Sequence, residues 1–194
     1  GAGVAFVGLV EGIADGSASL FKVFSGWASD RTNNRRPLII FGYSLSAITK
    51  PIIGLVGSPW HLLWIKFIDR VGKGIRTAPR DALLTYSCDV TERGRSFGFH
   101  RSMDHAGAII GPLIAFVLLR LLGVELRTIF LLSIIPGAAS VLILFLFIKE
   151  KRGIPKMVTT TRFKLSSFDR RFKLFLLIVL IFSLGNSSDA FLIL

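Results

Sequence analysis

The stretch GWASDRTNNRR, residues 26–36, sets Asp30, Arg31, Arg35 and Arg36 between two long apolar segments. The flanking segments run over about residues 1–25 and 37–57, and each contains roughly the 20 residues that an α-helix needs to cross about 30 Å of hydrocarbon. The sequence therefore predicts two membrane-spanning helices joined by a charged turn.

Four more apolar segments of this length follow the first two. We place all six near residues 1–25, 37–57, 60–86, 97–120, 128–148 and 174–194. They lack the period-2 alternation of barrel strands and are about twice as long, which favours helices. A hydrophobic content of 52% and a mean hydropathy of +0.63 also lie in the membrane range. We expect an all-α, polytopic membrane helical bundle.

Composition and motifs exclude several functional classes. The net charge of +12 could suggest a nucleic-acid partner, but the Lys and Arg residues gather mainly between apolar runs rather than in one stripe, so we expect no nucleic acid. The single Cys88 excludes a disulfide within the chain and a Cys-rich metal site. The sequence has no HExxH, GxSxG or GxxxxGK[ST] motif. We expect no enzyme, no cofactor and no bound metal.

The distribution of basic residues predicts the orientation. Short connections make neighbouring helices antiparallel, so alternate connections lie on the same side of the membrane. One side receives Arg31, Arg35, Arg36, Arg93, Arg95 and the basic stretch 149–173, whereas the other has only Arg120 and Arg127 near its helix ends. By the positive-inside rule the first side is cytoplasmic, in a multi-pass protein of the plasma (inner) membrane. Orientation alone could explain these bases, but it does not explain Asp30, because acids contribute little to topology.

Two cytoplasmic hairpins carry a family resemblance. The pattern GxxxDR followed by a basic pair comprises Gly26, Asp30, Arg31, Arg35 and Arg36. It resembles the loop between the second and third helices of the major facilitator superfamily, where Asp and Arg take part in a latch that favours the outward-facing state. The stretch DVTERGRSFGF, residues 89–99, is similar to the family's second cytoplasmic hairpin and supplies Arg93 and Arg95. Tyr86 stands where the family usually has an acid.

Two membrane segments extend the resemblance. RVGKGIRTAP, residues 70–79, resembles the family's fourth helix, with Arg70 four residues before Gly74. GAIIGPLIA, residues 107–115, resembles the GxxxGP signature that the family's antiporters often carry on the fifth helix, here Gly107, Gly111 and Pro112. These three residues permit a bend and close helix approach, and nonspecific helix packing is the alternative interpretation.

The resemblance also implies a domain organisation. Residues 1–148 would be helices 2 to 6 of an N-terminal six-helix half, residues 149–173 a basic cytoplasmic linker, and residues 174–194 the first helix of the C-terminal half. The chain would thus be a fragment with a partial major facilitator fold, matching helices 2 to 7 of 12.

Ionisable residues inside the spans are candidates for function, because a charge near the bilayer centre costs at least about 2.5–3.5 kcal/mol unless it is paired or hydrated. Glu11, Asp15, Ala18 and Lys22 follow one another at spacings of 4, 3 and 4, which places them on one helix face. Two carboxylates one turn apart repel each other when both are ionised, so one of them could carry a proton. The alternative is a buried ion-pair network with nearby bases.

A second line of charges repeats the same spacing: Asp69, Lys73, Arg76 and Arg80. Arg70 points about 100° away from Asp69. The bases could neutralise Glu11 and Asp15, or they could attract an anionic solute in a low-dielectric cavity. Arg80 and Arg76 could instead extend to the cytoplasmic interface.

The segment 97–120 adds His100 and Asp104 on one face, with Arg101 and His105 beside them. Asp104 lies roughly 12 Å along the helix from Ser96, close to mid-membrane. Histidine changes charge near neutral pH, so His105 could sense or relay protons, or it could be a hydrogen-bonded packing residue.

These features together predict a secondary active transporter that moves a small solute by alternating access, with protons as the coupling ion. The GxxxGP resemblance favours efflux by solute/proton antiport, and the interior bases favour an anionic or amphiphilic solute. The alternatives are a membrane-embedded enzyme and a channel without carrier activity.

Overall fold

The computed structural model describes residues 4–32, 34–148 and 169–185, and every regular element in these ranges is a helix. The elements are α1 (Val4–Thr32), α2 (Arg36–Ile53), α3 (Pro59–Ser87), the 3-10 turn η1 (Val90–Glu92), α4 (Arg93–Arg120), α5 (Leu126–Leu132), α6 (Ile134–Phe147) and α7 (Arg170–Gly185). The prediction of an all-α fold is confirmed.

Helix boundaries follow from local sequence. Pro37 and Pro59 lie in the first turns of α2 and α3, where a missing backbone N–H costs nothing. The turn after α4 uses Gly123 at φ 62°, and the Val124 N–H donates to the Leu118 carbonyl at 3.0 Å. The single segment predicted over 128–148 is divided at Ser133 into α5 and α6.

Several helices extend beyond the predicted apolar segments. α1 continues through Asp30 to Thr32, and α4 begins at Arg93 rather than at residue 97. The reason is that hydropathy marks the edge of the hydrocarbon, whereas backbone hydrogen bonding continues into the polar interface. Residues 149–168 of the predicted linker and residues 186–194 of the predicted last span lie outside the described residues.

The distribution of side chains suits a lipid environment. By length and composition, two helical segments of the described chain are able to cross a membrane, Val90–Arg120 and Leu126–Phe147. The interior charges of α1 and α3 lower the hydropathy of those helices. Large apolar side chains point outward, including Leu20 and Val23. The buried polar side chains are mostly small and lie between helices: Ser17, Ser25, Ser29, Ser46 and Thr49. Small polar residues at helix contacts are typical of membrane bundles.

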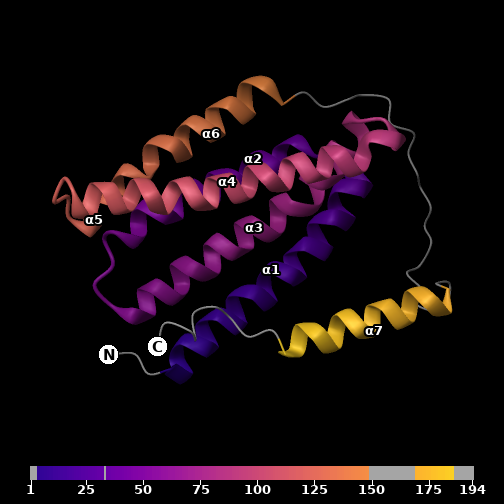
Figure 1. The fold of residues 1–194 in the computed structure, drawn as a ribbon, viewed down its shortest axis with the longest axis horizontal. Coiled ribbons are helices and arrows are strands. Elements are labelled where there is room, and N and C mark those ends of the chain that lie inside the picture. The colour runs from indigo at the N-terminus through magenta and orange to yellow at the C-terminus, as the bar shows by residue number, and fades with distance from the viewer. Residues whose placement is uncertain (1–3, 33, 149–168, 186–194) are drawn as a thin grey trace.

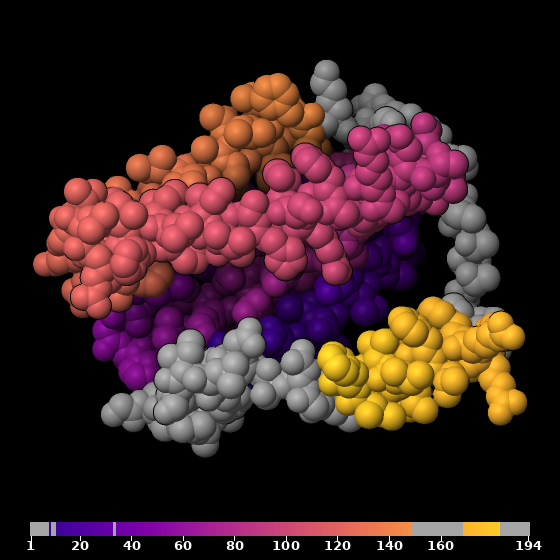
Figure 2. Space-filling view, in the orientation of Figure 1, coloured from indigo at the N-terminus to yellow at the C-terminus, as the bar shows by residue number. Residues whose placement is uncertain are grey.

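α3 is the central element of the packing. It packs against α1 and α2, and α2 packs in turn against α5 and α6. Figure 1 shows the α1–α2 connection, the α3–α4 connection and the end of α6 at one end of the bundle. The α2–α3 and α4–α5 connections lie at the other end, so alternate connections share a side, as predicted. Figure 2 shows α4 extended across one face of the molecule.

Glycines allow α3 to approach both neighbours closely. A Cβ atom on Gly42 of α2 would lie 2.6 Å from the Gly72 carbonyl oxygen and 2.7 Å from the Arg76 Cβ. A Cβ on Gly74 would lie 2.6 Å from the Ala18 carbonyl oxygen of α1. The Ser25 hydroxyl also donates to the Gly74 carbonyl at 3.1 Å. The α1–α3–α2 layer therefore depends on positions that accept no side chain.

Gly42→Ala should lower the free energy of unfolding of the purified protein in detergent by about 1–3 kcal/mol, because the added methyl group overpacks the α2–α3 contact. Gly16→Ala is the matched control, since a Cβ there meets no atom within 4 Å and alanine favours helix. Thermal unfolding followed by circular dichroism measures both variants. Equal stability of Gly42→Ala and the unchanged protein would contradict the close packing.

Candidate functional site

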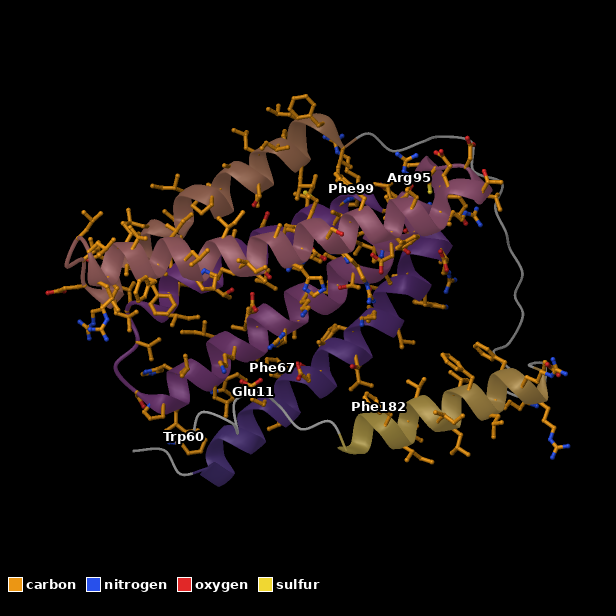
Figure 3. All side chains as sticks on the ribbon, viewed as in Figure 1. Glu11, Trp60, Phe67, Arg95, Phe99 and Phe182 are labelled. Atoms are coloured by element: carbon orange, nitrogen blue, oxygen red, sulfur yellow. The ribbon has the colours of Figure 1, made fainter. Side chains whose placement is uncertain are left out.

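An ion-pair network lies where α1 meets α3. Glu11, whose side chain is only 13% exposed, is 2.5 Å from the Lys66 Nζ through Oε1 and 3.9 Å from the Arg70 Nη2 through Oε2. The Nε of the same Arg70 is 3.5 Å from the Asp15 Oδ1. Figure 3 shows Glu11 beside Phe67 of α3. Two acids and two bases thus compensate one another across the helix pair.

Helix periodicity explains this pairing. Glu11 and Asp15 are one turn apart on α1, and Lys66 and Arg70 are one turn apart on α3, so two short rows of opposite charge face each other. The ion-pair network that the sequence left open is present. Proton carriage by Glu11 or Asp15 stays a prediction, and both carboxylates that it would require belong to this network.

A polar cavity of about 520 Å³ adjoins the network. It is lined by Asp15, Ala18, Ser19 and Lys22 of α1, Tyr43 of α2, Arg70, Lys73, Gly74, Arg76, Thr77 and Arg80 of α3, and Asp104 of α4. Ala18, Lys73 and Asp104 each lie near the middle of their helix. If these helices span the bilayer, the cavity lies near its centre.

Some of the charges that line the cavity are paired. Arg80 lies 3.0 Å from Asp81 through Nη2 and 4.0 Å from the Asp104 Oδ2 through Nη1. The His100 Nδ1 is 3.6 Å from the same Asp104 oxygen, a pair that is ionic only when the imidazole is protonated. Arg80 therefore has two carboxylates near its guanidinium at the cavity.

Three bases that line the cavity have no such compensation. Within the described residues, no carboxylate oxygen lies within 4.0 Å of a side-chain nitrogen of Lys22, Lys73 or Arg76. The Arg76 guanidinium instead lies 4.3 Å from the centre of the Tyr43 ring and donates to the Gly42 carbonyl at 3.4 Å. The cavity therefore has an excess of positive charge.

Asp69 does not join this group. Thr49 of α2 donates its hydroxyl to the Asp69 carboxylate at 3.4 Å, and Asp69 is not among the residues that line the cavity. The repeated spacing of 4, 3 and 4 places Lys73, Arg76 and Arg80 at the cavity, but Asp69 is turned towards α2. Arg70, about 100° away from it, meets α1.

The α1–α2 hairpin, which is predicted to be cytoplasmic, centres on Arg35. Its side chain is only 3% exposed, and its Nη2 lies 3.6 Å from the Asp30 Oδ1. The Arg35 guanidinium also lies 4.8 Å from the centre of the Tyr86 ring at the end of α3. Arg36 donates to the Phe145 carbonyl of α6 at 2.6 Å. The hairpin therefore ties together the ends of α1, α3 and α6.

The remaining predicted hairpin residues make other contacts. Arg31 stacks on Trp27 of its own helix, 5.4 Å from the ring centre. Arg95 lies 4.0 Å from Glu92 on the surface, and Arg93 begins α4. Figure 3 shows Arg95 near the start of α4. Gly26 lies where an added Cβ would be 3.4 Å from the Ala78 Cβ of α3.

Two groups of predicted residues on α4 do not line the cavity. Arg101 and His105 are exposed and do not line the cavity. A Cβ on Gly107 or Gly111 would meet no described atom within 4 Å, and the helix continues through Pro112. A role of these positions in proton transfer or close packing therefore stays a prediction.

Two residues of the site, Lys66 and Tyr43, are not predicted from the sequence. Lys66 carried a usable signal, because it lies one turn before Arg70 and opposite the acidic row of α1. Tyr43 carried none, because an aromatic residue in an apolar segment looks like a packing residue until Arg76 is found over its ring. In the described ranges, no group of three or more His, Cys, Asp or Glu side chains could hold a metal ion.

Comparison with known proteins gives a family match over the whole chain. The profile of the Major Facilitator Superfamily matches residues 1–194. An uncharacterized MFS-type transporter of Methanocaldococcus jannaschii is 34% identical over 194 residues, which are 100% of this chain and 48% of the relative. An uncharacterized protein of Mycobacterium tuberculosis is 34% identical over 151 residues, 77% of this chain and 36% of the relative.

A more distant relative is the multidrug resistance protein MdtH of Enterobacter sp., which is 32% identical over 114 residues, 59% of this chain and 28% of the relative. No solved structure matches the chain. The chain spans about half the length, or less, of the curated relatives it matches.

Proposed function

The chain belongs to the major facilitator superfamily, whose members are multi-pass membrane transporters and not enzymes, and from this premise we propose that it forms part of a proton-coupled secondary transporter. The transporter moves a small anionic or amphiphilic solute by alternating access, and it does so in the direction of efflux. Residues 1–148 form most of one half, and the stretch 149–173 links it to the next half.

One observation carries this proposal. A cavity of about 520 Å³ lies at mid-length of α1, α3 and α4, and charged side chains converge on it from all three helices. This volume lies within the range of about 300–1,000 Å³ that is usual for small-molecule sites. Charged groups inside a membrane bundle mark solute or ion pathways, because the free-energy cost of placing a charge in hydrocarbon is high.

The network at the α1–α3 contact is our candidate for proton coupling. Asp15 lines the cavity, so protons can reach it, and it holds Arg70 of α3 at 3.5 Å. Protonation of the carboxylate removes its attraction for the guanidinium. Proton binding is thereby linked to the contact between two helices whose relative movement alternating access requires.

Efflux is supported by the antiporter-like GxxxGP sequence of α4 and by the distant relatives named as multidrug resistance proteins. The excess of bases at the cavity supports an anionic solute.

Carboxyfluorescein, a membrane-impermeant amphiphilic anion, tests the function when it is trapped in proteoliposomes of the whole transporter to which this chain belongs. We expect saturable release that an inward proton gradient accelerates, with trans-acceleration by external carboxyfluorescein. Asp15→Asn should abolish the response to the gradient, because the amide cannot carry the proton. Asp89→Asn, at an exposed position outside the cavity, should keep it.

Three results would contradict this account. Release without trans-acceleration would indicate a channel. An unaltered gradient response in Asp15→Asn would remove this carboxylate from the proton pathway. Release no faster than from protein-free liposomes would exclude this class of solute.

We further propose that the Asp30–Arg35–Tyr86 contact acts as the cytoplasmic latch. The ring of Tyr86 takes the place of the acid that the family usually has there, since an aromatic face attracts a guanidinium without a net charge. The latch would hold the cytoplasmic ends of α1 and α3 together in one state and release them in the other.

Asp30→Asn should therefore leave membrane insertion intact and change the turnover rate severalfold, because the inward/outward balance shifts. Initial rates of carboxyfluorescein release measure the effect, and surface labelling of the vesicles measures the amount inserted. Glu125→Gln, at an exposed position in the α4–α5 connection at the other end of the bundle, is the control. Unchanged kinetics of Asp30→Asn at equal insertion would rule out the latch.

A further inference from the structure

We infer that the cavity binds a dianionic group of the phosphate-monoester type at Lys22, Lys73 and Arg76, which makes phosphate esters the preferred anions of this transporter. The inference rests on the proposed function and narrows it from anions in general to one chemical group.

Among the described residues that line the cavity, bases outnumber acids. Arg70 is compensated by Glu11 and Asp15, and Arg80 by Asp81 and Asp104. Lys22, Lys73 and Arg76 line the same cavity, and no carboxylate of the described chain lies within 4.0 Å of them. Three positive charges around one cavity repel one another strongly where the dielectric is low. A dianion with several acceptor oxygens offsets more of this repulsion than a single negative charge does.

Phosphate monoesters match these donors in charge and geometry. The group carries about −1.5 to −2 charges at neutral pH and three strong acceptor oxygens. Lys22 and Lys73 each offer an ammonium group, and both side chains are exposed to the cavity. Arg76 offers a planar fork that binds two oxygens at once.

Two contacts fix the orientation of the Arg76 side chain. Its guanidinium stacks on the Tyr43 ring at 4.3 Å and donates through Nη1 to the Gly42 carbonyl at 3.4 Å. These contacts fix the plane of the guanidinium before any ligand arrives, which lowers the entropy cost of binding.

The size of the cavity argues for an ester rather than for free phosphate. A volume of about 520 Å³ exceeds what a single phosphate group fills. The Tyr43 ring offers an apolar surface beside the bases, suited to the organic part of the ligand. The headgroup of phosphatidylglycerol is a phosphodiester with one negative charge, so it satisfies the site less well than a monoester.

Matched probes test the inference. Phenyl phosphate and phenyl sulfate are similar in shape but carry about two charges and one charge at pH 7.5. Isothermal titration calorimetry of the purified protein, in detergent and phosphate-free buffer, should show phenyl phosphate binding about tenfold or more tightly than phenyl sulfate. Inorganic phosphate should bind more weakly than phenyl phosphate because it lacks the ring.

Variants localise the binding. Lys73→Gln and Lys22→Gln should each weaken phenyl phosphate binding about tenfold, because each removes one charge-assisted hydrogen bond. Lys50→Gln, on α2 and away from the cavity, should leave the affinity unchanged. Thermal unfolding without ligand reports whether each variant is folded. Should Lys73→Gln be destabilised at the centre of α3, Lys22→Gln on α1 still provides the test.

Several outcomes would overturn the inference. Equal affinity for phenyl sulfate would remove the preference for a dianion, and binding that survives both lysine variants would place the site elsewhere. Competition by phosphatidylglycerol with the potency of phenyl phosphate would indicate a lipid site. Proton-driven carboxyfluorescein transport without phenyl phosphate binding would overturn this inference alone, whereas absence of both would overturn the transporter proposal as well.

Discussion

The organisation of this chain depends on the inability of hydrocarbon to solvate a charge. α1, α3 and α4 carry many ionised side chains along stretches long enough to cross a bilayer, and each of these charges must find an opposite charge, a polar partner or water. Glu11, Asp15, Lys66 and Arg70 satisfy one another across the α1–α3 contact. Lys22, Lys73 and Arg76 border a cavity, where water or an anionic ligand can solvate or pair with their charges.

Close packing makes this arrangement possible. Gly42, Gly72 and Gly74 let α3 lie so near to α1 and α2 that carbonyl groups and short hydroxyl side chains meet between the helices. With its sides occupied by α1 and α2, α3 has one charged face left for the cavity. Large apolar side chains are displaced outward to the lipid, which reverses the usual pattern of a water-soluble core.

Much of the fold could be read from the sequence, and the site only in part. Apolar runs and basic connections predicted the helices and the common end of the hairpins, and the spacing of Glu11 and Asp15 predicted their shared face. Which base meets which acid could not be predicted, because one sequence gives helix faces but not the crossing of helices. Arg70 pairs with Asp15 of α1, Asp69 accepts a hydrogen bond from Thr49, and Arg35 holds Asp30.

In the transporter that we propose, one face of α3 borders water in the middle of the membrane. Thr77 lines the cavity, and Ile75 lies about 200° around the same helix at nearly the same depth. In a Cys88→Ser background, Thr77→Cys should react with a membrane-impermeant maleimide in native membrane vesicles, and Ile75→Cys should not. Equal reactivity at the two positions, or reaction of Ile75→Cys alone, would contradict the account.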